Sequence, residues 1–300
     1  MTAQRTSAPT GLIAYLPTPV RGDRVDLAAF GRLVERAAAA GVDGLGVLGS
    51  TGAAMHVDRD ERRDVVRTAV AHTDLPVVAG ISGLRTSVVR AHADDAQAAG
   101  AAAVLLAPVG YVPLVDAEVV ALFTDVVAGL DVPLVVYDNP GTTRVDMSHG
   151  LLAELAALPG VGAIKTPGPT GGPDDARRRV AELRAFLPDS VTLGFSGDAS
   201  GPAGLLAGAD AWHSTVGGAL PDVVVPLARA AREGDKTVRD AVANLAPLWD
   251  LVRTHAGVRV AATFVELLGL VDAPSLPRPL LPLSGDARAD AARVLTALAG

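Results

Sequence analysis

Eight short apolar runs alternate with eight helix-like segments along residues 11–234, and this alternation limits the possible fold more than any other feature. Continuous apolar strands that alternate with helices indicate a parallel sheet covered on its outer face. Strands are expected at 11–17, 43–49, 75–80, 102–108, 132–140, 161–165, 191–197 and 210–214. Helices are expected at 26–41, 58–72, 86–100, 116–130, 148–158, 173–187, near 200–207 and at 220–234. Eight such units predict an α/β fold of the closed (β/α)8 TIM barrel type, with a doubly wound open sheet as the alternative.

The remaining segments predict the domain organisation. Residues 1–10 are expected to form a loose N-terminal tail, and residues 11–234 the barrel. Residues 235–300 are expected to form a C-terminal helical region packed on the barrel, because no Pro/Gly/Ser-rich linker separates them from it. Helical patterns in this region cover 237–255, 258–269 and 286–299.

Composition excludes several classes of function. The chain of 300 residues carries a formal net charge of −7 and only 3% aromatic residues, which argues against a nucleic-acid partner. No apolar run approaches the roughly 20 residues of a membrane span, so no membrane partner is expected. Cysteine is absent, which excludes disulfides and thiolate chemistry and favours a cytoplasmic location. We expect neither a metal ion nor a dissociable cofactor.

Lysine is rare in this chain, and one of its two lysines stands in an apolar setting. Lys236 lies in the charged segment REGDKTVRD, whereas Lys165 follows the apolar run VGAI. Arginine keeps its charge in proteins, while a buried lysine can lose its proton. Lys165 is therefore a candidate for amine chemistry, although a lysine that merely extends to the surface is the competing interpretation.

Polar side chains follow the predicted strands, on the barrel face where active sites lie. A neutral lysine amine attacks a ketone to form a Schiff base, and Tyr137 can supply a hydroxyl for proton transfer. Ser50 and Thr51 lie between glycines, where hydroxyl and backbone N–H groups can hold a carboxylate. These groups together indicate a 2-keto acid such as pyruvate. The competing interpretations are a core role for Tyr137 and an ordinary turn at Ser50.

Other strand-end residues have structural interpretations as well. Asp138 and Asp198 can cap helices or bind a metal ion, and capping is the more common role. His213 is expected to be structural or part of a pocket wall. Gly217 and Gly218 precede a helix, as in barrel phosphate sites, but a glycine pair is weak evidence.

Several segments in this order resemble the dihydrodipicolinate synthase / N-acetylneuraminate lyase family of pyruvate-dependent class I aldolases. They are LPTPV, GVDGLGVLGSTGAA, LPVVAG, VPLVVYDNP, GAIK and SGDAS, and the resemblance runs from about residue 11 to 285. It implies a (β/α)8 barrel with a C-terminal helical region and a homo-oligomer, usually a tetramer. It also implies Lys165 as the Schiff-base lysine, Tyr137 as the proton-relaying hydroxyl, and Ser50 with Thr51 at the pyruvate carboxylate. Further substrate contacts are expected at Gly52, Tyr111, Thr142, Ser196, Gly197, Asp198, Thr215 and Val216.

Three departures from the family pattern concern the substrate. Ala53 stands where the family usually has an acidic residue. Gly110 stands where the synthase carries a tyrosine that a neighbouring subunit donates to the relay, and Tyr111 follows it. Thr142 replaces an arginine that grips the second substrate's carboxylate, with Arg144 two residues further on. Because threonine cannot reproduce the guanidinium fork, this change argues against aspartate semialdehyde as the substrate.

The predicted function is a Schiff-base-forming lyase or aldolase that acts on pyruvate or a related 2-keto acid. Three alternatives keep the same fold: 4-hydroxy-tetrahydrodipicolinate synthase proper, a sugar-acid dehydratase, and a catalytically silent barrel that binds a keto acid. A metal-dependent lyase that uses Asp138, Asp198 or His213 is a fourth.

Overall fold

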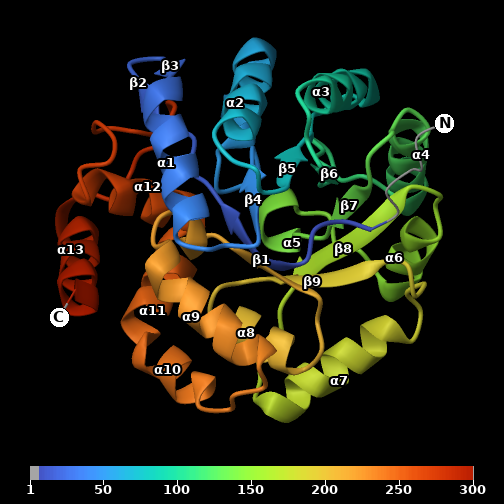
Figure 1. The fold of residues 1–300 in the computed structure, drawn as a ribbon. Coiled ribbons are helices and arrows are strands. Elements are labelled where there is room, and N and C mark those ends of the chain that lie inside the picture. Colours follow the sequence, from blue (N-terminus) through green and yellow to red (C-terminus); the bar gives the residue numbers. More distant parts are fainter. Residues whose placement is uncertain (1–6, 300) are drawn as a thin grey trace.

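The computed structural model describes residues 7–299 as a closed barrel of eight parallel strands surrounded by helices (Figure 1). The order around the barrel is β1-β10-β9-β8-β7-β6-β5-β4, so that β1 pairs with both β10 and β4 and closes the sheet. The predicted TIM barrel is thereby confirmed. The strands are β1 (Gly11–Tyr15), β4 (Gly44–Val47), β5 (Val77–Gly80), β6 (Ala103–Leu106), β7 (Leu134–Tyr137), β8 (Val161–Pro167), β9 (Thr192–Ser196) and β10 (Ala211–Ser214).

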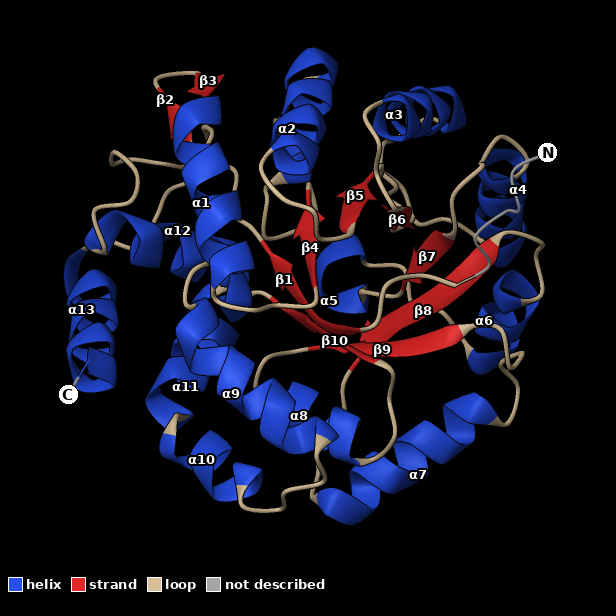
Figure 2. Ribbon diagram, in the orientation of Figure 1, coloured by secondary structure: helices blue, strands red, loops and turns tan. Residues whose placement is uncertain are grey.

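The helices form a ring outside the strands (Figure 2). In chain order they are α1 (Leu27–Ala39), α2 (Arg59–Ala71), α3 (Thr86–Ala98), α4 (Asp116–Val127), α6 (His149–Ala156), α7 (Pro173–Arg184), α8 (Gly201–Leu206) and α9 (Pro221–Arg232). Each lies within the segment predicted for it and is two or three residues shorter in total. None of the described helices is long and apolar enough to cross a membrane.

Short elements at the loops were not expected from the sequence. They are a hairpin of β2 (Val20–Arg21) and β3 (Arg24–Val25), the 3-10 turns η1 (Ala54–His56) and η2 (Val216–Gly218), and the short helix α5 (Pro140–Thr143). Helix α5 lies inside the ring of strands in the view of Figure 1. Pieces of three or four residues carry too little periodicity to be recognised in a sequence.

The C-terminal region consists of α10 (Val238–Asn244), α11 (Ala246–His255), α12 (Gly257–Leu267) and α13 (Gly285–Ala299). The helical pattern predicted over 237–255 is confirmed, but as two helices, because the chain breaks at Leu245 and restarts with Pro247 in the first turn of α11. A proline has no N–H to donate and fits the first turn of a helix but not its interior.

A buried carboxylate ties this region together and to the barrel. Glu266 of α12 accepts hydrogen bonds from the backbone N–H and the hydroxyl of Ser275, at 2.8 and 2.9 Å, and from Arg288 of α13 at 2.6 Å. The carbonyl of Ser275 in turn accepts from the N–H of Val20, at 2.9 Å. The N-terminal tail predicted over residues 1–10 lies outside the described residues for 1–6. Within its remainder, Ala8 is buried with the side chains of the barrel interior.

Successive residues of each strand face opposite sides of the barrel wall, as strand geometry requires. Ile13 and Tyr15 of β1 belong to the cluster that fills the barrel, together with Val135 and Tyr137 of β7 and Ala163 of β8. Their neighbours in sequence pack outward against the helices in a separate, larger cluster. The next inward position after Ala163 is that of Lys165.

Glycines make room for the aromatic ring of Tyr15 inside the barrel. Gly46 pairs with Tyr15 across β1 and β4, and a Cβ at Gly46 would lie 2.5 Å from the ring. A Cβ at Gly49 would lie 2.9 Å from the same ring. The glycines of the segment GLGVLG are therefore required by packing, since no real Cβ contact is that short.

We expect Gly46→Ala to lower the midpoint of thermal unfolding, because overpacking a dense core costs about 1–3 kcal/mol. The matched control is Gly150→Ala in α6, where the nearest atom to an added Cβ is 3.7 Å away. Alanine favours helix over glycine, so this control should unfold at the wild-type temperature or slightly higher. A Gly46→Ala protein as stable as the control would contradict the packing described for Tyr15.

Candidate active site

Lys165 lies in β8 on the inward face of the barrel wall and is only 3% exposed. Its register partners are Tyr137 on β7 and Gly194 on β9. The Nζ atom lies 3.7 Å from the ring centroid of Tyr15 and 3.8 Å from that of Tyr137. No hydrogen bond or ion pair from the described residues holds this atom. The amine is therefore enclosed by aromatic faces and free to react.

Burial lowers the pKa of Lys165 well below its usual value, because the ammonium form loses its hydration. The negative charge of Asp198 acts in the opposite direction and limits this decrease. His213 is also buried, and loss of hydration together with the nearby Lys165 lowers its pKa well below the usual value. His213 is therefore neutral at physiological pH and adds no second cation to the site.

Tyr15 was missed by the sequence analysis, which took its segment only as the first strand. Its hydroxyl lies 3.3 Å from Nδ1 of His213, so the two side chains are joined beneath the amine. A Cβ at Gly194 would lie 2.4 Å from the His213 ring, which explains that glycine beside Lys165. The sequence did contain a sign of this role. Tyr15 lies two residues after Ile13, on the same inward face of its strand, and the glycines of GLGVLG on and just after the neighbouring strand leave room for its ring.

The hydroxyl of Tyr137 has two polar neighbours besides the lysine. Ser50 Oγ lies 3.4 Å away, and Asn139 donates to the tyrosine oxygen through Nδ2 at 2.8 Å. Burial raises the pKa of Tyr137, so the hydroxyl stays protonated at neutral pH. Asn139, within the segment VPLVVYDNP, had no predicted role. Tyr137 and Ser50 thus form a short chain of hydroxyls next to the amine.

The loop after β4 carries the predicted Gly-Ser-Thr-Gly segment and is fixed from two sides. Thr51 Oγ1 lies 2.9 Å from Oγ1 of Thr215, which follows β10. Gly52 has no room for a side chain, since a Cβ would lie 3.0 Å from the backbone N of Leu48. This loop therefore brings the hydroxyls of Ser50 and Thr51 to the same mouth of the barrel as Tyr137.

A cavity of about 320 Å³ opens at this mouth. Its lining includes the predicted residues Ser50, Thr51, Tyr137, Thr142 and Thr215. The other lining residues come from the loops after β4, β5, β6 and β7, from the start of α12 and from the segment before α13. They are Leu48, Gly49, Ala53, Ala54, Met55, His56, Gly80, Ser82, Leu105, Ala107, Val109, Asn139, Thr143, Ala256, Gly257, Val258 and Leu280.

Backbone strain is concentrated around this cavity. Four non-glycine residues have a positive φ in the described part of the chain: Leu48 (56°), Ala53 (50°), Arg144 (59°) and Ala256 (64°). Three of them line the cavity, and Arg144 directly follows the lining residue Thr143. Such conformations persist only where the surroundings enforce them, and they are common at functional sites. This distribution singles out the barrel mouth independently of the lysine.

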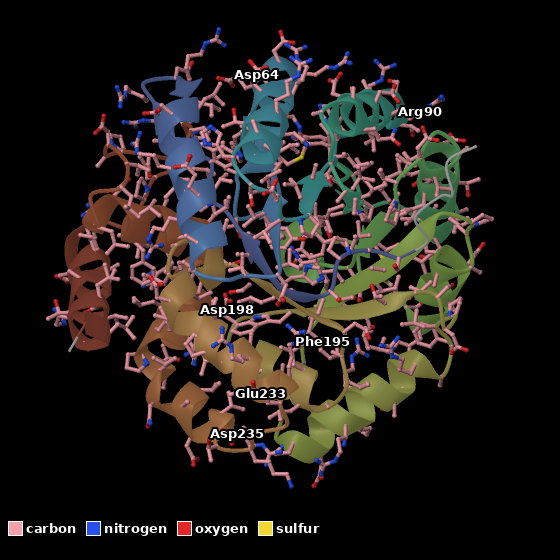
Figure 3. All side chains as sticks on the ribbon, viewed as in Figure 1. Asp64, Arg90, Phe195, Asp198, Glu233 and Asp235 are labelled. Carbon is pink, nitrogen blue, oxygen red and sulfur yellow. The ribbon has the colours of Figure 1, made fainter. Side chains whose placement is uncertain are left out.

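Asp198, predicted as a substrate contact, instead has its oxygens engaged within the chain. It accepts hydrogen bonds from the hydroxyl of Ser214 and from the N–H of Val216, the latter at 3.2 Å. Burial raises its pKa to about 6, so it is ionised at neutral pH. Figure 3 places it near the barrel, whereas Asp64 and Arg90 lie at the outer edge. We assign to Asp198 the roles of anchoring the loop after β10 and supplying a negative charge near Lys165.

Of the remaining predicted substrate contacts, some lie near the site and one lies on the outer surface. Ser196 is partly buried and donates to the carbonyl of Thr166, and Gly197 adopts a φ of 101°. Val216 is buried beside the site. Tyr111 is 97% exposed and does not line the cavity, so the structure does not bring it together with Lys165 within one chain. It lies on the exposed loop that precedes α4 and points away from the barrel interior.

The groups considered for a metal site do not converge. Asp138 accepts from the hydroxyl of Thr166 at 2.8 Å, while Asp198 and His213 bind the partners described above. Within residues 7–299, no group of three or more His, Asp or Glu side chains is placed to hold a metal ion. Gly218 has a packing role, because a Cβ there would lie 2.0 Å from the carbonyl oxygen of Tyr15.

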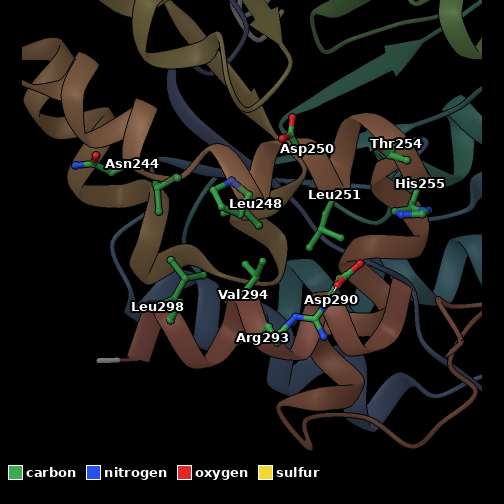
Figure 4. Close-up of a pocket in the computed structure, with 13 residues that line it drawn as sticks. Asn244, Leu248, Asp250, Leu251, Thr254, His255, Asp290, Arg293, Val294 and Leu298 are labelled. Carbon is green, nitrogen blue, oxygen red and sulfur yellow. Dashed lines mark ion pairs between the residues drawn. The ribbon is translucent and has the colours of Figure 1, made fainter. Parts of the chain in front are cut away.

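A larger groove of about 800 Å³ lies elsewhere, between α11 and α13 (Figure 4). Apolar side chains of Leu248, Leu251, Val294 and Leu298 face it from the two helices. Among the described residues it is lined by no tyrosine or serine, whereas the cavity at the barrel mouth is lined by Ser50 and by Tyr137, whose ring lies against the Lys165 amine. The barrel mouth, although smaller, is the candidate active site.

The whole chain is similar to known proteins. The model of the dihydrodipicolinate synthetase family matches residues 8–298. The chain belongs to this family. A curated 4-hydroxy-tetrahydrodipicolinate synthase of Xanthomonas axonopodis pv. citri is 33% identical over 287 residues, which cover 92% of this chain and 90% of that protein.

Solved structures of family members share the whole fold. A dihydrodipicolinate synthase of Agrobacterium tumefaciens is 40% identical with a TM-score of 0.91, covering 96% of this chain and 98% of that one. YagE, a prophage protein of E. coli K12 whose structure is a complex with pyruvate, is 25% identical with a TM-score of 0.85, covering 97% and 98%. The family, the barrel and the enzyme class predicted from the sequence, a lyase of the aldolase type, are therefore confirmed.

The pair of Lys165 and Asp198 generates a prediction about pH. Removing the negative charge in Asp198→Asn should lower the pKa of Lys165 further, because that charge favours the ammonium form. The neutral amine then persists to lower pH. The rate at which cyanoborohydride traps pyruvate on Lys165 falls on the acid side of its pH profile, and this acid limb should move to lower pH. The matched control Asp174→Asn changes a carboxylate that is 92% exposed, and should leave the limb in place. An acid limb shifted to higher pH in Asp198→Asn would contradict the assigned role.

Proposed function

We propose that this family member forms a Schiff base between Lys165 and the C2 carbonyl of pyruvate or a related 2-keto acid, and uses it to make or break a C–C bond. The observation that carries the proposal is the buried, unpaired amine between two tyrosine rings beside the hydroxyls of Ser50 and Thr51. The pyruvate complex of the related YagE protein supports the choice of keto acid.

Binding of the keto acid follows from the polar groups at the site. The hydroxyl of Thr51 and the backbone of the Gly-Ser-Thr-Gly loop are positioned to receive the carboxylate. The C2 carbonyl then faces the amine of Lys165, whose lowered pKa leaves a lone pair available for attack. Attack gives a carbinolamine, and loss of water gives the imine.

Proton transfer is assigned to Tyr137. Tyr137 gives its proton to the hydroxyl that leaves the carbinolamine as water, and Ser50 lies within reach of the tyrosinate that results. The cationic imine makes the C3 protons acidic, and the tyrosinate takes one of them, which leaves an enamine and restores the Tyr137 hydroxyl. The enamine carbon adds to the carbonyl carbon of an acceptor aldehyde, whose oxygen takes a proton from Tyr137. Water then hydrolyses the imine and restores the amine, so that keto acid and aldehyde combine into a 4-hydroxy-2-keto acid. Cleavage is the same sequence in reverse.

Two readouts separate binding from proton transfer. Borohydride with pyruvate should leave a reduced adduct on Lys165 and none on the exposed Lys236, as read by mass spectrometry of the digested protein. Tyr137→Phe should still give the adduct. Its exchange of the pyruvate C3 protons with deuterium should be slower by about 10²–10⁴-fold, the usual contribution of a positioned acid–base group.

Lys165→Arg is the control, since it keeps the positive charge but removes the nucleophile. It should abolish both adduct and exchange. An adduct without exchange in the wild-type chain would favour the alternative of a silent keto-acid-binding barrel. Exchange that survives in Lys165→Arg would contradict the Schiff-base mechanism altogether.

Assembly as a homo-oligomer is a further part of the proposal. Large apolar side chains are exposed on the neighbouring loops after β5 and β6: Leu84 (63%), Tyr111 (97%), Val112 (64%) and Val115 (61%). Exposed apolar surface of this kind marks contact sites. Sedimentation equilibrium should therefore give a dimer or tetramer, and Tyr111→Asp should shift it toward a smaller species. A monomeric wild-type chain would contradict this.

The cytoplasmic location and the absence of a cofactor stay predictions.

A further inference from the structure

The cavity of about 320 Å³ at the barrel mouth is lined by Tyr137, whose ring lies 3.8 Å from the Lys165 amine, and it is the route proposed here for the acceptor carbonyl compound. The walls that it would contact therefore limit its chemistry. Apart from the groups assigned to the keto acid, the lining consists largely of apolar side chains. The largest of these are Leu48, Met55, Leu105, Val109, Val258 and Leu280.

No permanently charged side chain lines this space. Among its lining residues within 7–299 there is no Asp, Glu, Lys or Arg, and His56 and Tyr137 are the ionisable ones. Arg144, the arginine nearest in sequence to the lining residues Thr142 and Thr143, is exposed and does not line the cavity. A carboxylate on the acceptor would find no lysine or arginine among the described residues of the cavity walls.

A second arginine lies close by but is engaged elsewhere. Arg62 of α2 is buried and donates to the carbonyl oxygens of Ala54 at 2.5 Å, Gly80 at 3.0 Å and Ser82 at 3.3 Å. These bonds hold the loops after β4 and β5 from behind the cavity wall. The guanidinium therefore supports the lining and does not present its donors to a ligand.

The polar lining groups are also largely satisfied within the chain. The hydroxyl of Ser82 donates to the carbonyl of Ala107 at 2.9 Å and accepts from the N–H of the same residue at 3.0 Å. Thr143 donates to the carbonyl of Asn139 at 3.0 Å. The hydroxyl of Thr142 makes no hydrogen bond within the described residues. The imidazole of His56 likewise has no hydrogen-bond partner among the described residues. These two groups can orient an acceptor oxygen, but neither supplies the permanent positive charge that a buried carboxylate needs as a partner.

We infer that the acceptor is an aldehyde with an uncharged, apolar substituent, and that carboxylate-bearing aldehydes are disfavoured. This inference rests on the proposed function, because it describes the partner of the same enamine. The cavity volume lies at the small end of the range for ligand pockets, about 300–1,000 Å³, so the substituent is of modest size.

Matched pairs of aldehydes test the inference on the wild-type protein with pyruvate. The pairs are 4-methylbenzaldehyde with 4-carboxybenzaldehyde, and pentanal with succinic semialdehyde. Each pair differs mainly in a carboxylate against an apolar group. The expected result is a kcat/KM at least about tenfold higher for the apolar member of a pair, the scale of discrimination by an apolar pocket.

A charge introduced at the cavity wall gives a second test. Thr142→Arg should shift the ratio of the two kcat/KM values toward the carboxylate, since a guanidinium then lines the cavity. Thr142→Gln is the matched control, because it adds a polar side chain without a charge and should keep the wild-type preference. If Thr142→Arg prefers the apolar aldehydes as strongly as Thr142→Gln does, the lack of a charge in the cavity wall is not the cause of the preference, and the inference is overturned.

Exchange of the pyruvate C3 protons with deuterium, measured without any aldehyde, separates the two levels of the proposal. Exchange together with equal or faster turnover of the carboxylated aldehydes would overturn the inference and leave the proposed function standing. Exchange without turnover of any of the four aldehydes would overturn it as well. Loss of exchange itself would overturn the proposed function and, with it, the inference.

Discussion

Removal of one lysine amine from water is the interaction on which the rest of this structure depends. Lys165 is placed inside the barrel by strand parity, and its Nζ lies under 4 Å from the ring centroids of Tyr15 and Tyr137. Burial of an ammonium group is unfavourable, so the same packing that encloses the amine also lowers its pKa. Asp198 opposes this decrease from a loop that its own hydrogen bonds hold in place. Reactivity and packing are therefore two results of one arrangement.

The aromatic enclosure explains glycines that would otherwise look like loop residues. Gly46 and Gly49 leave room for the Tyr15 ring, and Gly194 leaves room for His213. Tyrosine is scarce, with three residues in the whole chain, and two of them lie against the lysine. The inner barrel is therefore a fitted layer of rings and glycines, whereas the outer core is made of ordinary aliphatic packing between strands and helices.

The groups proposed for catalysis and those proposed to contact the acceptor come from different parts of the fold. Tyr137 and Lys165 lie on paired strands, whose register fixes their distance. The walls for the acceptor come largely from the short elements η1 and α5, from the start of α12 and from the segment before α13. Non-glycine residues with a positive φ lie at or beside the first three of these. Rigid strands keep a reaction constant while loops change its substrate, a division common to barrel enzymes. Family membership therefore supports the chemistry more strongly than it supports any one acceptor.

The sequence by itself determined the barrel, because eight apolar runs alternating with helices have few other solutions, and it marked Lys165 by rarity and setting. Tyr15 has its role through contacts with residues across the barrel, and Asn139 through a contact within its own loop. Neither contact can be read from a linear pattern of residues. Only the tertiary structure decided that Tyr111 points outward, that Asp198 is engaged by its own chain, and that the proposed acceptor walls, among the described residues, contain no Asp, Glu, Lys or Arg. These are properties of side-chain direction and enclosure, and they exist only once the strands have closed into a barrel.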